Sequence, residues 1–165
     1  MQAKQVFGVP LAASLIPAID TQMEGRFCQH TKEEWKAETE GNKILTNLHS
    51  YIPIDWICVR TPNFRCHSQA ITFKLKTSLS VAALSEILRQ GSQVAVIPNE
   101  SEVTKKLLNP IAASNSLKIY VGRIKKTTIG EDIYSLFNIG DQLLWGAAEP
   151  LRRGLRLIEK FCAYR

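Results

Sequence analysis

Residues 69–76 read QAITFKLK, and from position 71 onward apolar and polar side chains alternate without a break. Successive side chains of a β-strand point to opposite faces, so Ile71, Phe73 and Leu75 would share one face. The polar side chains between them would lie on the other face. The pattern therefore predicts a half-buried strand, and further elements must cover its apolar face.

The other predicted elements alternate between helices and strands. A helix is expected over residues 31–46, because Thr31 can cap its first turn and Glu34 can complete a capping box. Ser80 or Ser78 would cap the next helix, which ends near Gly91. The remaining patterns predict helices at 101–108 and after residue 141, and strands at 54–60, 93–97, 117–125 and 133–139, the last two as a hairpin.

This order of elements predicts an α+β fold, with helices packed on a mixed sheet and a further helix at the C-terminus. Pro150 should kink or restart that last helix. Residues 6–19 are apolar but broken by glycine and proline, so we expect a buried irregular or short extended segment there. An apolar stripe recurs along the C-terminal helix at steps of four and three residues: Leu144, Ala148, Leu151, Leu155 and Ile158.

Length and composition indicate one soluble globular domain, since 45% of the 165 residues are hydrophobic. A formal charge of +6 permits nucleic acid, an anionic membrane surface or a phosphorylated small molecule as partner. The three tryptophans are dispersed, which provides no stacking platform for single-stranded nucleic acid. Without a spanning stretch or signal-peptide pattern, we expect a cytoplasmic protein that binds neither nucleic acid nor membrane.

The four cysteines, Cys28, Cys58, Cys66 and Cys162, have no Cys-x-x-Cys spacing and are expected to be reduced thiols. Cys28 and His30 form a local Cys-x-His, but no second cluster completes a tetrahedral zinc site, so no metal is predicted. Neither glycine-rich signature of a nucleotide-phosphate loop occurs in the sequence. The chain alone is therefore not expected to bind a dinucleotide.

Four separated motifs are informative when read together: EEWK at 33–36, CVR at 58–60, RCHSQA at 65–70 and GDQLLWGAAEPLRR at 140–153. They resemble the C-terminal half of bacterial aspartate-semialdehyde dehydrogenase. The resemblance also includes FGVPL at 7–11 and IPN at 97–99, and it runs from about residue 6 to about residue 160.

The resemblance implies an oxidoreductase of amino-acid biosynthesis, on the route to lysine, threonine and methionine. The family's complete enzyme reduces aspartyl phosphate with NADPH, through a cysteine thioester, to aspartate semialdehyde and phosphate. Its N-terminal half carries the dinucleotide fold and a nucleophile in a Gly-Asn-Cys context, which no cysteine here shares. Residues 1–140 would be the dimerisation and substrate domain, and residues 141–165 a helix returning to the absent nucleotide domain.

Arg60 and His67 are the first candidate site residues. A guanidinium binds a carboxylate through two parallel hydrogen bonds, and the resemblance implies that Arg60 holds the substrate carboxylate. An imidazole exchanges protons near neutral pH, and the resemblance implies that His67 is the general acid and base. His67 could return toward Arg60 if strands 54–60 and 69–76 formed a hairpin. His30 and His49 have no matching context and are expected to be structural.

Glu33 and Lys36 project from one face of the first predicted helix, because they are three residues apart. A solvated ion pair would explain them equally well. The resemblance implies that Glu33 faces the substrate ammonium group and Lys36 the phosphate. Gln142 begins the last helix, where backbone N–H groups favour an anion, and the resemblance implies that it contacts NADP. With the nucleotide domain absent, tight NADP binding is not expected.

The leading hypothesis is the C-terminal portion of a truncated or split NADP-dependent aspartate-semialdehyde dehydrogenase, inactive alone. It would form a homodimer through the strands from residue 65 onward, or pair with a chain that carries the nucleotide half. Several leucines of the last helix would otherwise face water. The alternative is a non-catalytic dimerisation or regulatory module that pairs with a full-length relative.

Overall fold

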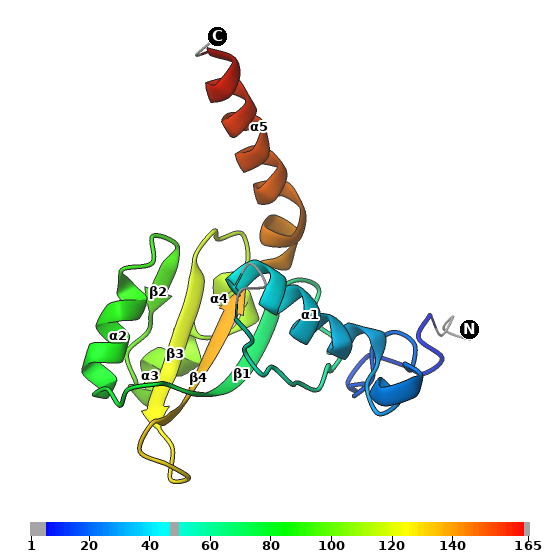
Figure 1. Cartoon of the computed structure of the whole chain (residues 1–165), viewed down its shortest axis with the longest axis horizontal. Coiled ribbons are helices and arrows are strands. Elements are labelled where there is room, and N and C mark those ends of the chain that lie inside the picture. The colour runs from blue at the N-terminus through cyan, green and yellow to red at the C-terminus, as the bar shows by residue number, and fades with distance from the viewer. Residues whose placement is uncertain (1–5, 47–49, 164–165) are drawn as a thin grey trace. The chain divides into compact units, whose positions relative to one another are not determined.

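The computed structural model describes residues 6–46 and 50–163. These fall into two compact units, Met1–Pro62 and Asn63–Arg165, which are described in turn. Both are visible in Figure 1, where the colours follow the chain from blue to red.

The larger unit is built on a four-stranded sheet in the order β1-β4-β3-β2. β1 pairs with β4 and β4 with β3 in antiparallel fashion, whereas β2 and β3 are parallel, so the sheet is mixed. Figure 1 shows β1, β4 and β3 running side by side. The predicted α+β class with a mixed sheet is therefore confirmed. The strands are β1 (His67–Lys74), β2 (Val94–Val96), β3 (Ile119–Lys126) and β4 (Ile133–Gly140).

The alternating stretch forms β1, two residues earlier than the pattern predicted. Ile71 and Phe73 are half-buried, while Ala70 before them and Thr72 between them are exposed. The alternation therefore identified the two faces correctly, although Leu75 lies beyond the end of the strand. The predicted hairpin of β3 and β4 is also present, with Gly130 between the two strands.

Helices cover both faces of this sheet. α2 packs on β2 and β3, and α4 packs on β4. Tyr134 belongs to one apolar cluster together with Leu84 of α2, and Ile139 belongs to a second cluster with Leu108 and Ala113. Residues 134 and 139 of one strand face opposite sides, so the two clusters lie on opposite faces. The helices are α2 (Val81–Arg89), α3 (Ser101–Leu107) and α4 (Pro110–Ala113).

The helices at 80–91 and 101–108 are confirmed, and Ser80 is the cap of α2, because its hydroxyl accepts from the Ala83 N–H at 3.1 Å. The short α4 was not predicted. It begins at Pro110, two residues beyond the predicted end of the preceding helix at residue 108. Proline suits the first turn of a helix, since its missing N–H would have had no partner there.

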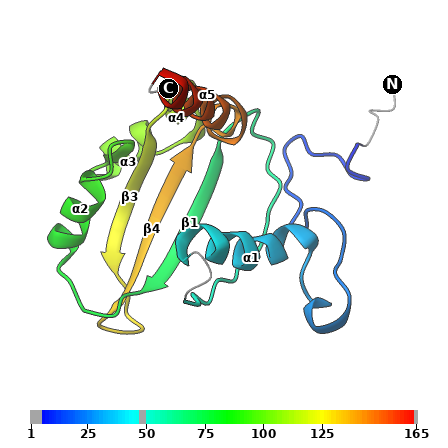
Figure 2. The same ribbon diagram turned by 45° about the horizontal axis from the view of Figure 1, so that its top comes forward.

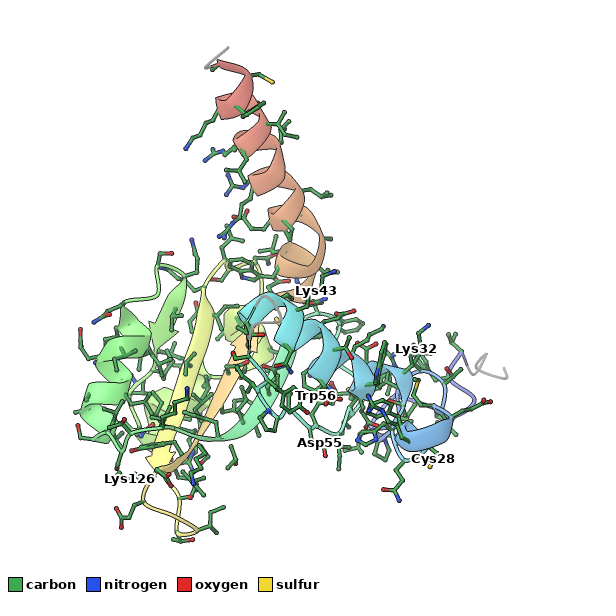
Figure 3. All side chains as sticks on the ribbon, in the orientation of Figure 1. Cys28, Lys32, Lys43, Asp55, Trp56 and Lys126 are labelled. Carbon is green, nitrogen blue, oxygen red and sulfur yellow. The ribbon has the colours of Figure 1, made fainter. Side chains whose placement is uncertain are left out.

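The C-terminal segment is irregular next to Pro150, where a kink or restart was predicted, and its long α-helix begins at Glu149. A π-helical turn, η2 (Leu144–Ala148), leads into α5 (Glu149–Ala163), and the Glu149 N–H bonds to the carbonyl of Leu144, five residues back. Pro150 has no N–H to continue an α-helical ladder through this turn. Figure 3 shows side chains projecting to both sides of α5. As expected, apolar side chains of α5 are exposed: Leu151, Leu155, Leu157, Ile158 and Phe161.

The smaller unit contains one long helix, α1 (Lys32–Thr46), and a single 3-10 turn, η1 (Gly25–Phe27). The predicted capping box at its start is confirmed. The Thr31 N–H donates to Glu34 Oε2 at 2.8 Å, and the Glu34 N–H donates to Thr31 Oγ1 at 3.4 Å. Figure 2 shows α1 along most of its length.

Two predictions for this unit are wrong. Residues 54–60 form no strand, because their only ladder contact is at Arg60, which exchanges two backbone hydrogen bonds with Ile16. The partner proposed for that strand, β1, is instead paired along its whole length with β4. Residues 6–19 are irregular as expected, but they are not buried, since Phe7, Val9 and Leu15 are all exposed.

No helix among residues 6–46 and 50–163 is long and apolar enough to cross a membrane. The boundary expected at residue 140 stays a prediction.

Leu84→Ala should destabilise the chain by about 2–5 kcal/mol, because it leaves a cavity in the cluster around Tyr134. Leu84 is 5% exposed, whereas Ile87 on the same helix is 51% exposed. Ile87→Ala is therefore the matched control and should cost less than about 1 kcal/mol. Urea unfolding followed by circular dichroism measures both. Equal losses would contradict the packing described for α2.

Candidate functional site

Two predicted site residues, His67 and Gln142, lie at one end of the sheet in the larger unit. His67 is the first residue of β1 and pairs with Gly140, the last residue of β4. Gln142 follows two residues after Gly140. Both side chains are exposed. Because His67 pairs with Gly140, the β1·β4 register places the backbones of His67 and Gln142 near each other.

A fully buried carboxylate belongs to Asp141, the residue between Gly140 and Gln142. Arg65 Nη2 contacts Asp141 Oδ2 at 2.6 Å, and the Asn115 N–H donates to the same oxygen at 2.6 Å. The Leu143 N–H donates to the other oxygen, Oδ1, at 3.0 Å. Burial by itself would raise the pKa of Asp141, but the Asn115 N–H and the Arg65 guanidinium outweigh it and hold that pKa below its ordinary value.

The residue between Arg65 and His67 is also held. Cys66 is buried, has a φ of 76°, and its thiol lies 3.4 Å from the Pro110 carbonyl oxygen. A non-glycine residue keeps such a left-handed backbone only where its surroundings enforce it. Both residues that precede His67 are thus held in place, Arg65 by Asp141 and Cys66 by its packing at Pro110.

Gln142 does not make a cofactor site by itself. The N–H groups of Leu143 and Leu144, which could have faced a phosphate, donate to Asp141 Oδ1. The Gln142 side chain lies against Gly146, where a Cβ would clash with its amide. A contact between Gln142 and NADP stays a prediction, and the N–H groups of residues 143 and 144 are already hydrogen-bonded within the chain.

Glu33 and Lys36 lie on one face of α1, as their spacing predicted. Lys36 Nζ contacts Glu33 Oε2 at 2.8 Å, and both side chains are partly exposed. The hydrogen bond to Glu33 raises the pKa of Lys36. This contact is consistent with the solvated pair and also with two opposite charges that await a ligand.

Arg60 belongs to the same unit as Glu33 and Lys36. Its segment is fastened to α1, because the Cys58 N–H donates to Glu34 Oε1 at 3.0 Å. Asp55 and Trp56 mark this segment in Figure 3. The guanidinium carbon lies 4.6 Å from the centre of the Phe7 ring, and no described residue forms an ion pair with Arg60. Its hydrogen-bond donors are therefore available to a carboxylate from outside.

The structure brings the predicted residues together in two groups, one in each unit. Glu33, Lys36 and Arg60 belong to the smaller unit, and His67 and Gln142 to the larger. One cleft shared by the side chains of Arg60, His67, Glu33 and Lys36 stays a prediction. His30 contacts Asp55 at 3.3 Å, and His49 lies outside the described residues.

The four cysteines differ in burial and surroundings. Burial and the neighbouring Glu34 raise the pKa of Cys58, which disfavours its thiolate. Cys66 is buried, and Cys28 and Cys162 are exposed single thiols. Among the described residues, no three histidine, cysteine or acidic side chains gather as metal ligands would.

The sequence reasoning missed two buried carboxylates near the site, Asp141 and Glu149. Glu149 is 4% exposed, and it accepts 2.7 Å hydrogen bonds from both Arg152 and Arg153. The hydrogen bond from Arg152, followed by that from Arg153, lowers the pKa of Glu149 from 4.5 to about 2. The signal for Glu149 was present, because acids three and four residues before arginines can pair on a helix.

Residues 1–145 match the family model of the semialdehyde dehydrogenase dimerisation domain. The chain is 49% identical to aspartate semialdehyde dehydrogenase from Francisella tularensis, covering 90% of this chain and 40% of that one, with a TM-score of 0.85.

Two more distant structures share the fold. Aspartate semialdehyde dehydrogenase II from Vibrio cholerae, complexed with ASA, is 24% identical over 93% of this chain and 43% of its own, with a TM-score of 0.80. The Candida albicans enzyme with NADP is 16% identical over 81% of this chain and 41% of its own, with a TM-score of 0.54. The chain thus spans about two fifths of the length of these relatives.

The lowered pKa of Glu149 predicts a pH-dependent stability. The unfolded chain takes up the proton near pH 4.5, whereas the folded chain takes it up near 2. The carboxylate therefore stabilises the fold above about pH 4.5, and this contribution is lost as the pH falls toward about 2. Urea unfolding at several pH values should show a shallower acid decline for Glu149→Gln than for the natural chain.

Glu86→Gln is the control, because Glu86 forms an exposed pair with Arg89 three residues later. It should keep the acid decline of the natural chain. An unchanged decline in Glu149→Gln would show that the arginine contacts do not hold this carboxylate ionised.

Proposed function

The chain belongs to the semialdehyde dehydrogenase dimerisation-domain family, and from this premise we propose that it is the C-terminal portion of an NADP-dependent aspartate-semialdehyde dehydrogenase. Its share of the biosynthetic reaction would be to bind aspartyl phosphate and to move protons as aspartate semialdehyde and phosphate form. The 49% identity to the Francisella tularensis enzyme, together with the motifs around Arg60 and His67, carries this proposal. A cytoplasmic location belongs to the same proposal.

Arg60 would orient the substrate by binding its carboxylate. The Arg60 guanidinium lies against the Phe7 ring, and the Arg60 backbone exchanges two hydrogen bonds with Ile16. These contacts restrict the orientation of the guanidinium. A planar fork accepts both carboxylate oxygens at once, which a lysine cannot do.

His67 would act as the general acid and base. Its exposed imidazole has no hydrogen bond or ion pair with the described residues, so both ring nitrogens can meet substrate. Glu33 would face the substrate ammonium group and Lys36 the phosphate. Their 2.8 Å contact would then open when a ligand with matching charges enters.

NADP would be bound mainly by the nucleotide half, which supplies the hydride chemistry when the cofactor is present. Gln142 is the one residue of this chain that we assign toward it. The Asp141 carboxylate already accepts hydrogen bonds from the Leu143 and Leu144 N–H groups, so the chain alone should bind NADP very weakly. The Vibrio cholerae and Candida albicans structures contain ASA and NADP respectively, which is consistent with this division of roles.

A partner chain would complete the enzyme. The exposed leucines of α5 give such a partner an apolar surface, and the family's dimerisation domain supports a homodimer in addition. A homodimer would use the open part of the sheet, where Ala70, Thr72, Arg123 and Lys125 line a shallow hollow.

The purified chain alone should not oxidise NADPH in the presence of aspartyl phosphate, because it lacks a suitable nucleophile. Mixing it with the separately produced nucleotide-binding half of the Francisella tularensis enzyme should give turnover. His67→Ala should then lower kcat by about 10²–10⁴-fold. Arg60→Lys should raise KM for aspartyl phosphate by roughly 10–100-fold, through loss of a charged hydrogen bond.

Arg89→Lys is the matched control for Arg60, because Arg89 lies on α2 in an exposed ion pair. It should leave both constants unchanged. Turnover by the chain alone, or a mixture that is indifferent to His67→Ala, would contradict the proposal. Inhibition of a full-length relative without turnover would instead support a regulatory module.

Thr72→Arg should convert the homodimer to monomers, because Thr72 is exposed on β1 and a bulky cation there would meet Arg123 and Lys125. Sedimentation equilibrium measures the change in mass. Gln90→Arg, at the exposed end of α2, adds the same side chain elsewhere and should leave the dimer intact. A natural chain that is monomeric at high concentration would contradict this interface.

A further inference from the structure

Asp141 joins three segments that are far apart in the sequence. Its carboxylate contacts Arg65 before β1, Asn115 after α4, and the first turn beyond β4 through Leu143. Arg65 Nη1 also donates to Asn115 Oδ1 at 2.8 Å, which closes the network. A fully buried carboxylate persists only with such a set of donors, so these segments cannot separate without a large penalty.

The network stands beside both site residues of the larger unit. Gln142 directly follows Asp141, and His67 follows Arg65 by two residues. Between Arg65 and His67, the left-handed Cys66 is packed against Pro110, which leaves little freedom to the backbone. Neither exposed side chain has a comparable anchor of its own.

We propose that Asp141 is a positioning residue, which fixes the His67 and Gln142 backbones relative to each other through its ion pair with Arg65. The inference rests on the proposed function, because it assigns these two residues to substrate and cofactor. The proton-transferring group and the residue nearest the cofactor are thereby held as one rigid piece. Asp141 itself touches no reacting atom and is not a catalytic residue.

Glu149 provides a matched control for this proposal. It is also a buried carboxylate that accepts hydrogen bonds from arginine side chains. Its partners, Arg152 and Arg153, belong to its own helix, so it ties no distant segments together. Loss of either carboxylate should destabilise the fold, but only loss of Asp141 should disturb His67.

The first experiment is independent of catalysis and uses the full chain. The imidazole signal of His67, assigned by its absence in His67→Gln, is followed by two-dimensional NMR. In Asp141→Asn we expect this signal to shift and broaden, and the His67 backbone amide to exchange with solvent about ten times faster or more. In Glu149→Gln the His67 signal should stay at its natural position.

The second experiment uses turnover in the mixture with the nucleotide-binding half. Asp141→Asn should lower kcat by roughly 10–100-fold. KM for aspartyl phosphate should change little, because Arg60 belongs to the other unit. Adding Arg65→Met removes the unpaired cation and should recover stability. It should not recover kcat, because the tie between the segments is still absent.

The outcomes separate the two proposals. An unmoved His67 signal in Asp141→Asn would overturn the positioning role, whatever the mixture does. Recovery of kcat together with stability in the double variant would also overturn it, since Asp141 would then be purely structural. A mixture that never turns over contradicts the proposed function alone, because the NMR comparison still decides the role of Asp141.

Discussion

A carboxylate with no solvent contact can stay ionised only if protein donors replace the water it has lost. Asp141 meets this condition through a guanidinium and backbone N–H groups from separate parts of the chain. That requirement determines how the end of the sheet is built. The start of β1, the loop after α4 and the turn after β4 must all converge on one point. The backbone positions of His67 and Gln142 are consequences of this convergence.

The smaller unit also depends on the hydrogen bonds of one carboxylate, that of Glu34. Glu34 closes the capping box with Thr31 through one oxygen, and it accepts the Cys58 N–H with the other. A single side chain therefore starts α1 and fastens the segment that leads to Arg60. These hydrogen bonds, from Thr31 first and Cys58 second, lower the pKa of Glu34 and keep it ionised. In both units, a carboxylate that touches no proposed substrate determines where the proposed substrate residues lie.

The surfaces left open fit a chain that spans two fifths of the length of its relatives. The apolar side of α5 is exposed, and the open part of the sheet carries a shallow hollow. In the proposed enzyme, partner chains would cover both surfaces. By contrast, the apolar clusters on the two faces of the sheet are closed within this chain. The sheet and its helices thus enclose their own apolar clusters, whereas the apolar side chains of α5 are exposed.

The sequence by itself determined the features that depend on near neighbours. Alternation predicted the faces of β1, Thr31 and Ser80 predicted helix starts, and Pro150 predicted the restart of the last helix, because these effects act within about one turn or one strand repeat. The short motifs also indicated the family and its candidate residues. Only the tertiary structure decided that residues 54–60 form no strand, because a strand requires a neighbour along its length and this segment pairs with one only at Arg60, through Ile16. It also decided the surroundings of Asp141, since Arg65 and Asn115 are fifty positions apart and no local pattern links them.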